Sequence, residues 1–238
     1  MPKSPGAATQ LKIASRWPLG VALTSWRYMW RTTPIHRTET TGDPVEHGPP
    51  AIPPGVSADE IQYASDGVGP LFHRLYRTRI KDSGATGEDL IEMVAKDPDR
   101  VSPSEFATFR KVRGEGGAMR VGDEFVVRMA APWDGPVRVV RREADRFVFA
   151  TLKGHLEAGQ IEFRCSDRDG VVVFEFGSWA RNKDRLTNLL YSHMRMSKEI
   201  QLHMWISFLE RVIRLSGGRR DGGLRIDTRR VEDVPTSA

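Results

Sequence analysis

The stretch NKDRLTNLLYSHMRMSKEIQLHMWISFLERVIRLS, from Asn182 to Ser216, decides the fold. Apolar side chains recur in it at helical spacing, and Gly217 and Gly218 follow directly. Because Asn182 suits an N-cap and the glycines suit a helix end, the stretch predicts one helix roughly 50 Å long. Its predicted inward face consists of Leu186, Leu189, Leu190, Ile200, Met204, Phe208 and Leu215.

Three polar residues, His193, Ser197 and Gln201, interrupt this apolar face at intervals of four. If they are buried, they need protein partners, water or a ligand. Two interpretations have equal weight. The three side chains orient the polar head of a ligand, or they lie at the margin of an ordinary core.

Upstream of the long helix the apolar pattern has a period of two, which predicts β-strands. Short turns such as Asp134-Gly135 join consecutive strands, so we expect an antiparallel meander with one apolar face. The strands are expected over 71–80, 125–129, 137–142, 147–151, 161–165 and 172–178.

Two short helices are expected after the first of these strands. A capping box from Thr86 to Asp89 opens one helix, and Pro98 ends it. The pair Ser102-Pro103 predicts the start of a second helix. Together with the strands and the long helix, they indicate an α+β fold whose sheet curls around the C-terminal helix.

Composition narrows the function classes. The 238 residues carry a formal charge of +5, which permits contact with nucleic acid or an anionic membrane without requiring it. Nucleic-acid binding is not expected, because the aromatic residues lie on inward strand faces and do not alternate with basic ones. Cys165 is the single cysteine, so no disulfide forms within the chain and a reducing, cytoplasmic location is favoured. The histidines lack metal-ligand spacing, and neither a metal nor a cofactor is expected.

Four segments are predicted along the chain. Residues 1–36 form a basic, aromatic arm that is expected to be helical, and 37–68 form a proline-rich linker in which Ile61 favours contact with the domain. Residues 69–216 form the compact domain, and 217–238 a flexible tail. The arm contains Trp17, Trp26 and Trp30, which favour docking on the protein or a second subunit over peripheral contact with a membrane.

Three stretches resemble a known family: MRVGDEFVVRM, FVFATLKGHLEAGQIEF from Phe147 to Phe163, and VVVFEFGSWARNKDRLTNL from Val171 to Leu189. They are similar to the family catalogued as domain of unknown function nineteen-ninety, within the helix-grip superfamily of START lipid-transfer domains, birch-pollen allergens and polyketide cyclases. The resemblance covers Gly69 to Leu215. It implies a curved antiparallel sheet around a long C-terminal helix, with a cavity between them. That fold usually has seven strands, so we expect a seventh within 117–121.

The cavity implied by the resemblance predicts a protein that binds a hydrophobic or amphipathic small molecule, lipid- or polyketide-like, without catalysis. Its expected lining combines Phe125, Phe149, Phe163, Phe174, Phe176, His193, Ser197, Ile200, Gln201, Met204 and Phe208. One alternative is a cyclase- or dehydratase-type enzyme in which His155 and Glu157 act as general acid and base. We favour a structural role for His155 in its own loop, because no nucleophile motif accompanies it. Another alternative is a membrane or partner-binding module that acts through the arm.

Overall fold

The computed structural model describes residues 34–103, 107–129, 134–183 and 195–232, without the side chains of 129 and 195–201. Its strands are β1 (Ile35–Thr41), β2 (Val68–Lys81), β3 (Ala107–Arg113), β4 (Glu124–Met129), β5 (Asp134–Arg142), β6 (Arg146–Thr151), β7 (Glu157–Arg168), β8 (Val171–Asn182), β9 (Arg219–Arg220) and β10 (Leu224–Val231). The helices are α2 (Gly87–Lys96) and α4 (Arg195–Leu215), with short 3-10 turns η1 (Ala64–Asp66) and η2 (Pro98–Arg100).

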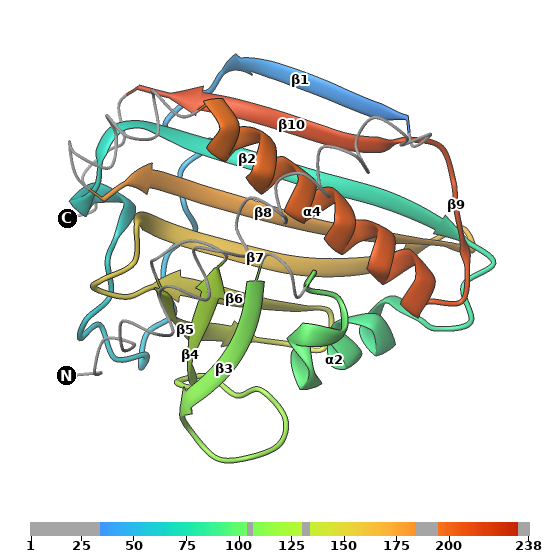
Figure 1. Ribbon diagram of the computed structural model, residues 1–238, viewed down its shortest axis with the longest axis horizontal. Coiled ribbons are helices and arrows are strands. Elements are labelled where there is room, and N and C mark those ends of the chain that lie inside the picture. The colour runs from blue at the N-terminus through green and yellow to red at the C-terminus, as the bar shows by residue number, and fades with distance from the viewer. Residues whose placement is uncertain (1–33, 104–106, 130–133, 184–194, 233–238) are drawn as a thin grey trace.

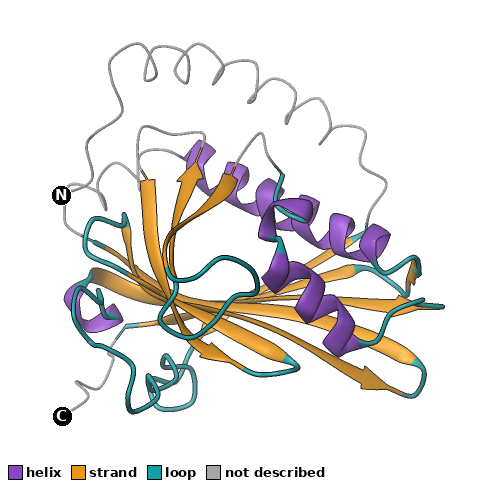
Figure 2. Ribbon diagram, turned by 90° about the horizontal axis from the view of Figure 1, so that it is seen from below, coloured by secondary structure: helices purple, strands orange, loops and turns teal. Residues whose placement is uncertain are grey.

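All the described strands belong to one sheet, in the order β1-β10-β2-β8-β7-β6-β5-β4-β3, with β9 beside β2. β1 and β10 run parallel, and the other pairs are antiparallel. In Figure 1 the long strands from β1 to β7 form one wing, and β6 to β3 curl away from it. Both helices pack on the same side of the sheet, as Figure 2 shows. We call this side the inner face and the opposite side the outer face. This curved sheet around a long C-terminal helix is a helix-grip fold, as the sequence predicts.

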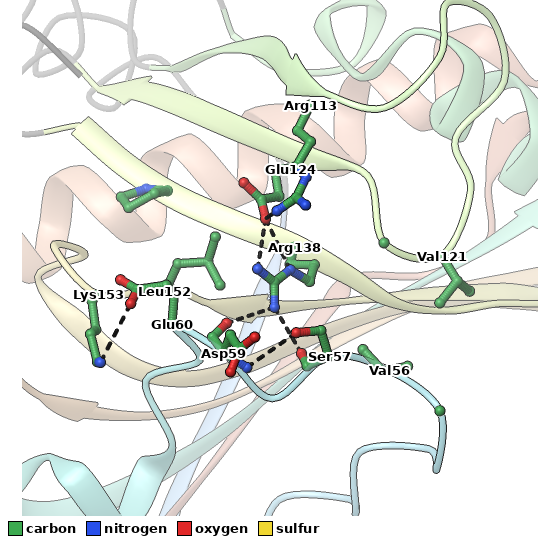
Figure 3. Close-up of a pocket in the computed structure, with 13 residues that line it drawn as sticks. Val56, Ser57, Asp59, Glu60, Arg113, Val121, Glu124, Arg138, Leu152 and Lys153 are labelled. Carbon is green, nitrogen blue, oxygen red and sulfur yellow. Dashed lines mark hydrogen bonds and ion pairs between the residues drawn. The ribbon is translucent and has the colours of Figure 1, made fainter. Parts of the chain in front are cut away.

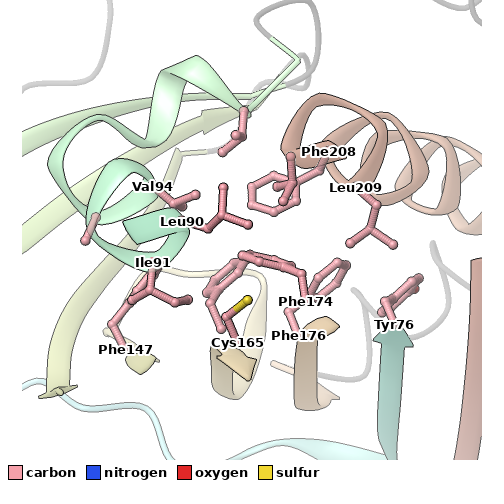
Figure 4. Packing of buried hydrophobic residues seen from close by; sticks show 14 of the residues in the cluster. Tyr76, Leu90, Ile91, Val94, Phe147, Cys165, Phe174, Phe176, Phe208 and Leu209 are labelled. Atoms are coloured by element: carbon pink, nitrogen blue, oxygen red, sulfur yellow. The ribbon is translucent and has the colours of Figure 1, made fainter. Parts of the chain in front are cut away.

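The main core lies between the inner face, α2 and α4 (Figure 4). Strand alternation supplies its sheet half, because every second residue points inward. α4 supplies a stripe of four nearly inaccessible side chains, Leu202, Ile206, Leu209 and Val212. At about 25 cal/mol per Å² of buried apolar surface, these layers are the main stabilising term of the domain.

The capping box that predicts α2 is present. The Thr86 hydroxyl accepts a hydrogen bond from the Asp89 N–H at 3.1 Å, and the Asp89 carboxylate accepts one from the Thr86 N–H at 2.9 Å. The Asp89 carboxylate also accepts a hydrogen bond from the Thr86 hydroxyl at 2.7 Å. This bond and the one from the Thr86 N–H lower the pKa of Asp89, since they favour its charged form. The helix ends before Pro98, also as predicted, and its apolar face contacts the core at Leu90, Ile91 and Val94.

The second short helix is a wrong prediction in its described part. Ala107–Arg113 forms β3, which pairs with β4 in register Phe109 to Val127. The Ser102 hydroxyl donates to the Ala107 carbonyl at 2.7 Å. Pairing along β4 therefore overrides a local helix-start signal. β3 is also an additional strand, located before the 117–121 segment where one was expected.

The tail is a wrong prediction, and so is the start of the linker, whereas the predicted contact of Ile61 with the domain is present. β1 joins the sheet from the expected arm and linker, and β10 joins it from the expected tail, between β1 and β2. Residues 42–63, which we call the outer strap, run across the outer face. The Gln160 amide donates to the Pro50 carbonyl at 2.9 Å, and Ile61 forms a bridge with Leu152. The prolines thus shape an extended cover, which needs no regular element of its own.

The long helix differs from its prediction in where it starts and in which of its side chains face the core. Asn182 is the last residue of β8 and not an N-cap, and the described helix has 21 residues, about 31 Å. Phe208 is buried as predicted, whereas Met204 is only half-buried and the inward stripe is centred on Ile206. His193 and the tryptophans Trp17, Trp26 and Trp30 lie outside the described residues.

Candidate functional site

The predicted aromatic lining is brought together on the inner face. Phe125 and Phe149 meet edge to face at 5.7 Å between ring centroids. At the other end, Phe163 contacts Phe176 at 5.6 Å and Phe208 at 5.5 Å. The last of the predicted rings, Phe174, is fully buried and lies 6.2 Å from Phe208. These six rings pack on one another as part of the main core, and we call them the aromatic floor.

Further apolar side chains continue this floor without being fully covered. Phe109 of β3, Val127 of β4, Ile161 of β7 and Trp205 of α4 pack against the core and remain partly exposed. The Trp205 ring lies 4.5 Å from that of Phe176. We call these four residues the inner apolar rim. They were not predicted as lining, although the period-two pattern of β4 and β7 places Val127 and Ile161 on the face of Phe125 and Phe163.

The remaining predicted lining belongs to α4 and its approach. Ser197, Ile200 and Gln201 fall in the first turns of α4, where the side chains are not described, and His193 precedes the helix. Met204 is half-buried, one residue before Trp205. The role of these five positions in ligand binding stays a prediction.

His155 lies in the connection between β6 and β7, where its ring orders the loop. Its Nδ1 accepts a hydrogen bond from the Glu157 backbone N–H at 2.9 Å. The Gln62 side chain, from the outer strap, donates to the carbonyl oxygens of His155 and Glu157 at 3.2 and 2.9 Å. Burial lowers the pKa of His155, because an imidazolium is poorly solvated there. These contacts agree with the structural interpretation, and the catalytic alternative stays a prediction.

Gly159 has a structural reason to be glycine. It pairs with Ala180 of β8, and a Cβ built on it would overlap the carbonyl oxygen of Trp179. The strands β7 and β8 can approach this closely only without a side chain at that position. The segment from Gly154 to Gly159, which is the most specific part of the family resemblance, is therefore accounted for by loop and strand geometry.

A pocket of about 490 Å³ opens on the outer face, between the outer strap and β4 and β5 (Figure 3). Arg138 is its buried centre, with a side chain 5% exposed. Its guanidinium donates to Glu124 at 2.6 Å and to the carbonyl oxygens of Ser57 and Asp59, both at 2.7 Å. Every nitrogen of the guanidinium is thus engaged within the protein. These contacts of Arg138, which we call the clamp, hold the outer strap against β4 and β5. The sequence pattern does not predict them.

A second outer-face cluster lies under the start of the outer strap. The rings of His73 and Trp179 stack at 4.6 Å, and His47 of the outer strap lies 6.0 Å from His73. The Nδ1 atom of His73 and the Nε1 atom of Trp179 are buried without a hydrogen-bond partner among the described residues. Burial, with His47 and Arg229 nearby, lowers the pKa of His73 to about 4. His73 is therefore neutral at pH 7 and behaves as a packing residue.

Family comparison agrees with this architecture. The profile of the family described as Domain of unknown function (DUF1990) matches residues 71–211, more than half of the chain. The chain belongs to the DUF1990 family. No curated protein matches it. In this DUF1990 domain the matched residues include β2 to β8 and most of α4, whereas β1, β9 and β10 lie outside the match.

Solved structures similar to the DUF1990 domain have low identity. Norcoclaurine synthase from Thalictrum flavum, in complex with dopamine and hydroxybenzaldehyde, has 11% identity, a TM-score of 0.44, and coverage of 70% of this chain and 95% of its own. The di-domain ARO/CYC StfQ from the steffimycin biosynthetic pathway has 10% identity, a TM-score of 0.48, and coverage of 65% and 52%. Ara h 8.0201 has 11% identity, a TM-score of 0.35, and coverage of 58% and 99%. Likeness at this level carries no argument about activity.

Two searches of the described residues bear on other classes of site. No helix in the described part of the DUF1990 chain is both long and apolar enough to cross a bilayer. Within the same residues, no three histidine, cysteine, aspartate or glutamate side chains gather into a group that could hold a metal ion. Cys165 is buried in β7, and burial raises the pKa of its thiol to about 12.

Proposed function

We propose that this DUF1990 domain binds a hydrophobic or amphipathic small molecule, lipid- or polyketide-like, between the inner face of its sheet and α4, without catalysing a reaction. The observation that carries the proposal is the inner apolar rim of Phe109, Val127, Ile161 and Trp205, which stays partly exposed beside a floor of stacked rings. Apolar surface left in contact with water costs about 25 cal/mol per Å², and a ligand that covers it recovers that energy.

Absence of catalysis is supported by how His155 is used. Its Nδ1 and the Glu157 backbone hold each other in the loop, and Gln62 fixes both carbonyls. This use of Nδ1 gives His155 a structural role that accounts for its place in the loop without a catalytic one. A cytoplasmic location, and contact of the arm with a membrane or a second subunit, remain predictions from the sequence.

A matched pair of substitutions tests the binding site. Val127 and Val126 are consecutive, similarly half-buried residues of β4 on opposite faces of the sheet. Val127→Trp fills space at the inner apolar rim, so we expect it to weaken binding of the neutral dye N-phenyl-1-naphthylamine about tenfold, or 1.4 kcal/mol. Val126→Trp adds the same ring to the outer face and should leave the affinity unchanged. Fluorescence titration of the full chain measures both.

Thermal unfolding of the two variants provides the control for folding. Equal loss of dye affinity in both variants would place the dye elsewhere. Failure of the wild-type chain to bind the dye, or any of a panel of long-chain lipids, would remove the proposed function.

A further inference from the structure

Three polar side chains lie side by side on the inner face, one row beyond the aromatic floor. Strand register places Thr228 of β10 opposite Arg74 of β2, and Arg74 opposite Ser178 of β8. All three residues are half-buried. In the adjacent row Tyr76 is buried and stacks on Phe176 at 4.5 Å. Because residues two apart on a strand share a face, Arg74 points to the same side of the sheet as Tyr76.

This row lacks internal partners. Among the described residues, none hydrogen-bonds the side chains of Arg74, Thr228 or Ser178, and Arg74 makes no ion pair. Its guanidinium lies 4.7 Å from the centre of the Phe72 ring, a contact that leaves its N–H donors available. The next outer-face arginine of β2 is different, since Arg77 is paired with Glu175. Partial burial of a guanidinium costs free energy when no anion pairs with it, so a neighbouring acid or a ligand is needed to offset that cost.

The acidic residues described on this face do not pair with Arg74. Glu39 of β1 stands at the end of the same row, opposite Thr228, and is therefore two strands from Arg74. It is exposed, and no ion pair joins it to Arg74 in the described structure. Glu157 of β7 shares the face but has an interaction of its own. Among the acids of the described structure, none therefore compensates the charge of Arg74 beside this apolar surface.

We propose that Arg74, with the hydroxyls of Thr228 and Ser178, binds the anionic head of the amphipathic ligand whose apolar part lies on the inner apolar rim at Trp205. The inference rests on the proposed function and names its ligand class: an apolar chain or ring system that ends in a carboxylate or a phosphate. A guanidinium binds either group through two parallel N–H donors, and adjacent hydroxyls complete the set. Tyr76 can add a donor, since burial raises its pKa to about 12 and keeps its hydroxyl protonated.

The test compares three ligands that share one dodecyl chain and differ in their polar head group. Dodecanoate, dodecyl phosphate and dodecanol are titrated into the full chain below their micelle concentrations, by displacement of N-phenyl-1-naphthylamine. We expect the wild-type chain to bind an anion at least about tenfold more tightly than the alcohol, the size of one charge-assisted contact. Arg74→Gln should reduce the affinity for the anion to that for dodecanol and leave dodecanol unchanged. The tighter of the two anions identifies the head.

Two further variants separate the site from net charge and from misfolding. Arg79→Gln removes the same charge from the exposed outer face of β2, where Arg79 pairs with Asp221, and should keep the preference for anions. Arg74→Lys keeps the positive charge but loses the paired N–H donors of the guanidinium, so it should retain part of the preference for anions. Equal binding of the three ligands by the wild-type chain overturns the anion site while the proposed function stands. An equal loss of affinity for the anions in Arg74→Gln and Arg79→Gln also overturns the anion site. If the wild-type chain binds none of the three ligands, both proposals are overturned.

Discussion

Replacing Arg138 by alanine is expected to lower the free energy of unfolding by about 3–5 kcal/mol, the cost typical of breaking a buried ion pair. The guanidinium is almost inaccessible and joins Glu124 to two carbonyl oxygens of the outer strap. Its loss leaves a largely buried carboxylate and two backbone acceptors without their donor. We also expect the outer strap to become accessible to proteases. Urea unfolding and limited proteolysis of the full chain measure the two effects.

Arg113 provides the matched control, because it donates to the same carboxylate of Glu124 at 3.3 Å. Its side chain is 72% exposed, so Arg113→Ala should cost at most about 1 kcal/mol. If Arg138→Ala cost no more than Arg113→Ala, the outer strap would not depend on the clamp. Arg138→Lys should fall between the two, since an ammonium cannot span Glu124 and both carbonyls.

Gly159→Ala is expected to cost about 3 kcal/mol or more, because the new methyl group overlaps the carbonyl oxygen of Trp179 and forces β7 and β8 apart. The two strands pair from Glu157 to Arg168, so the displacement disturbs the centre of the sheet. Thermal and urea unfolding of the full chain give the loss of stability.

Gly170→Ala is the control that separates the cost of a left-handed backbone conformation from the cost of the close approach between β7 and β8. It turns the chain between β7 and β8 with φ of 73°, and a Cβ there meets nothing within 4 Å. Gly170→Ala should therefore cost only the roughly 1–2 kcal/mol of a left-handed alanine. A similar cost at both positions would show that strand approach does not require the glycine at 159.

The elements predicted correctly are those whose signal is local. α2 was found from its capping box, and β4 to β8 from alternation along each strand. β3 was missed because Ser102-Pro103 gives a helix-start signal, whereas the pairing of Phe109 with Val127 is known only in the folded sheet. β10 was missed because Leu224 and Ile226 are its inward apolar residues, and polar side chains follow. Its parallel partner β1 lies 189 residues away in sequence.

The candidate site divides in the same way. Phe125 and Phe163 were predicted as lining because each strand pattern places an aromatic residue inward. Arg74 was not predicted, since its neighbours Thr228 and Ser178 come from strands whose register the sequence does not contain. The phase of α4 was misjudged because the apolar pattern was extended upstream through Asn182, which ends a strand. Local patterns thus predict which aromatic side chains face inward, and only tertiary pairing brings Arg74 beside Thr228 and Ser178.

Two tryptophans on opposite faces of the sheet report directly where a ligand binds. Trp205 of α4 contacts the inner aromatic floor, and Trp179 of β8 stacks on His73 on the outer face. Their indole N–H resonances can be followed by NMR in the isotope-labelled full chain during titration with dodecanoate, with Trp205→Phe and Trp179→Phe for assignment. Binding on the inner face predicts that the Trp205 resonance shifts and saturates while that of Trp179 stays in place. A saturating shift at Trp179 with none at Trp205 would contradict it.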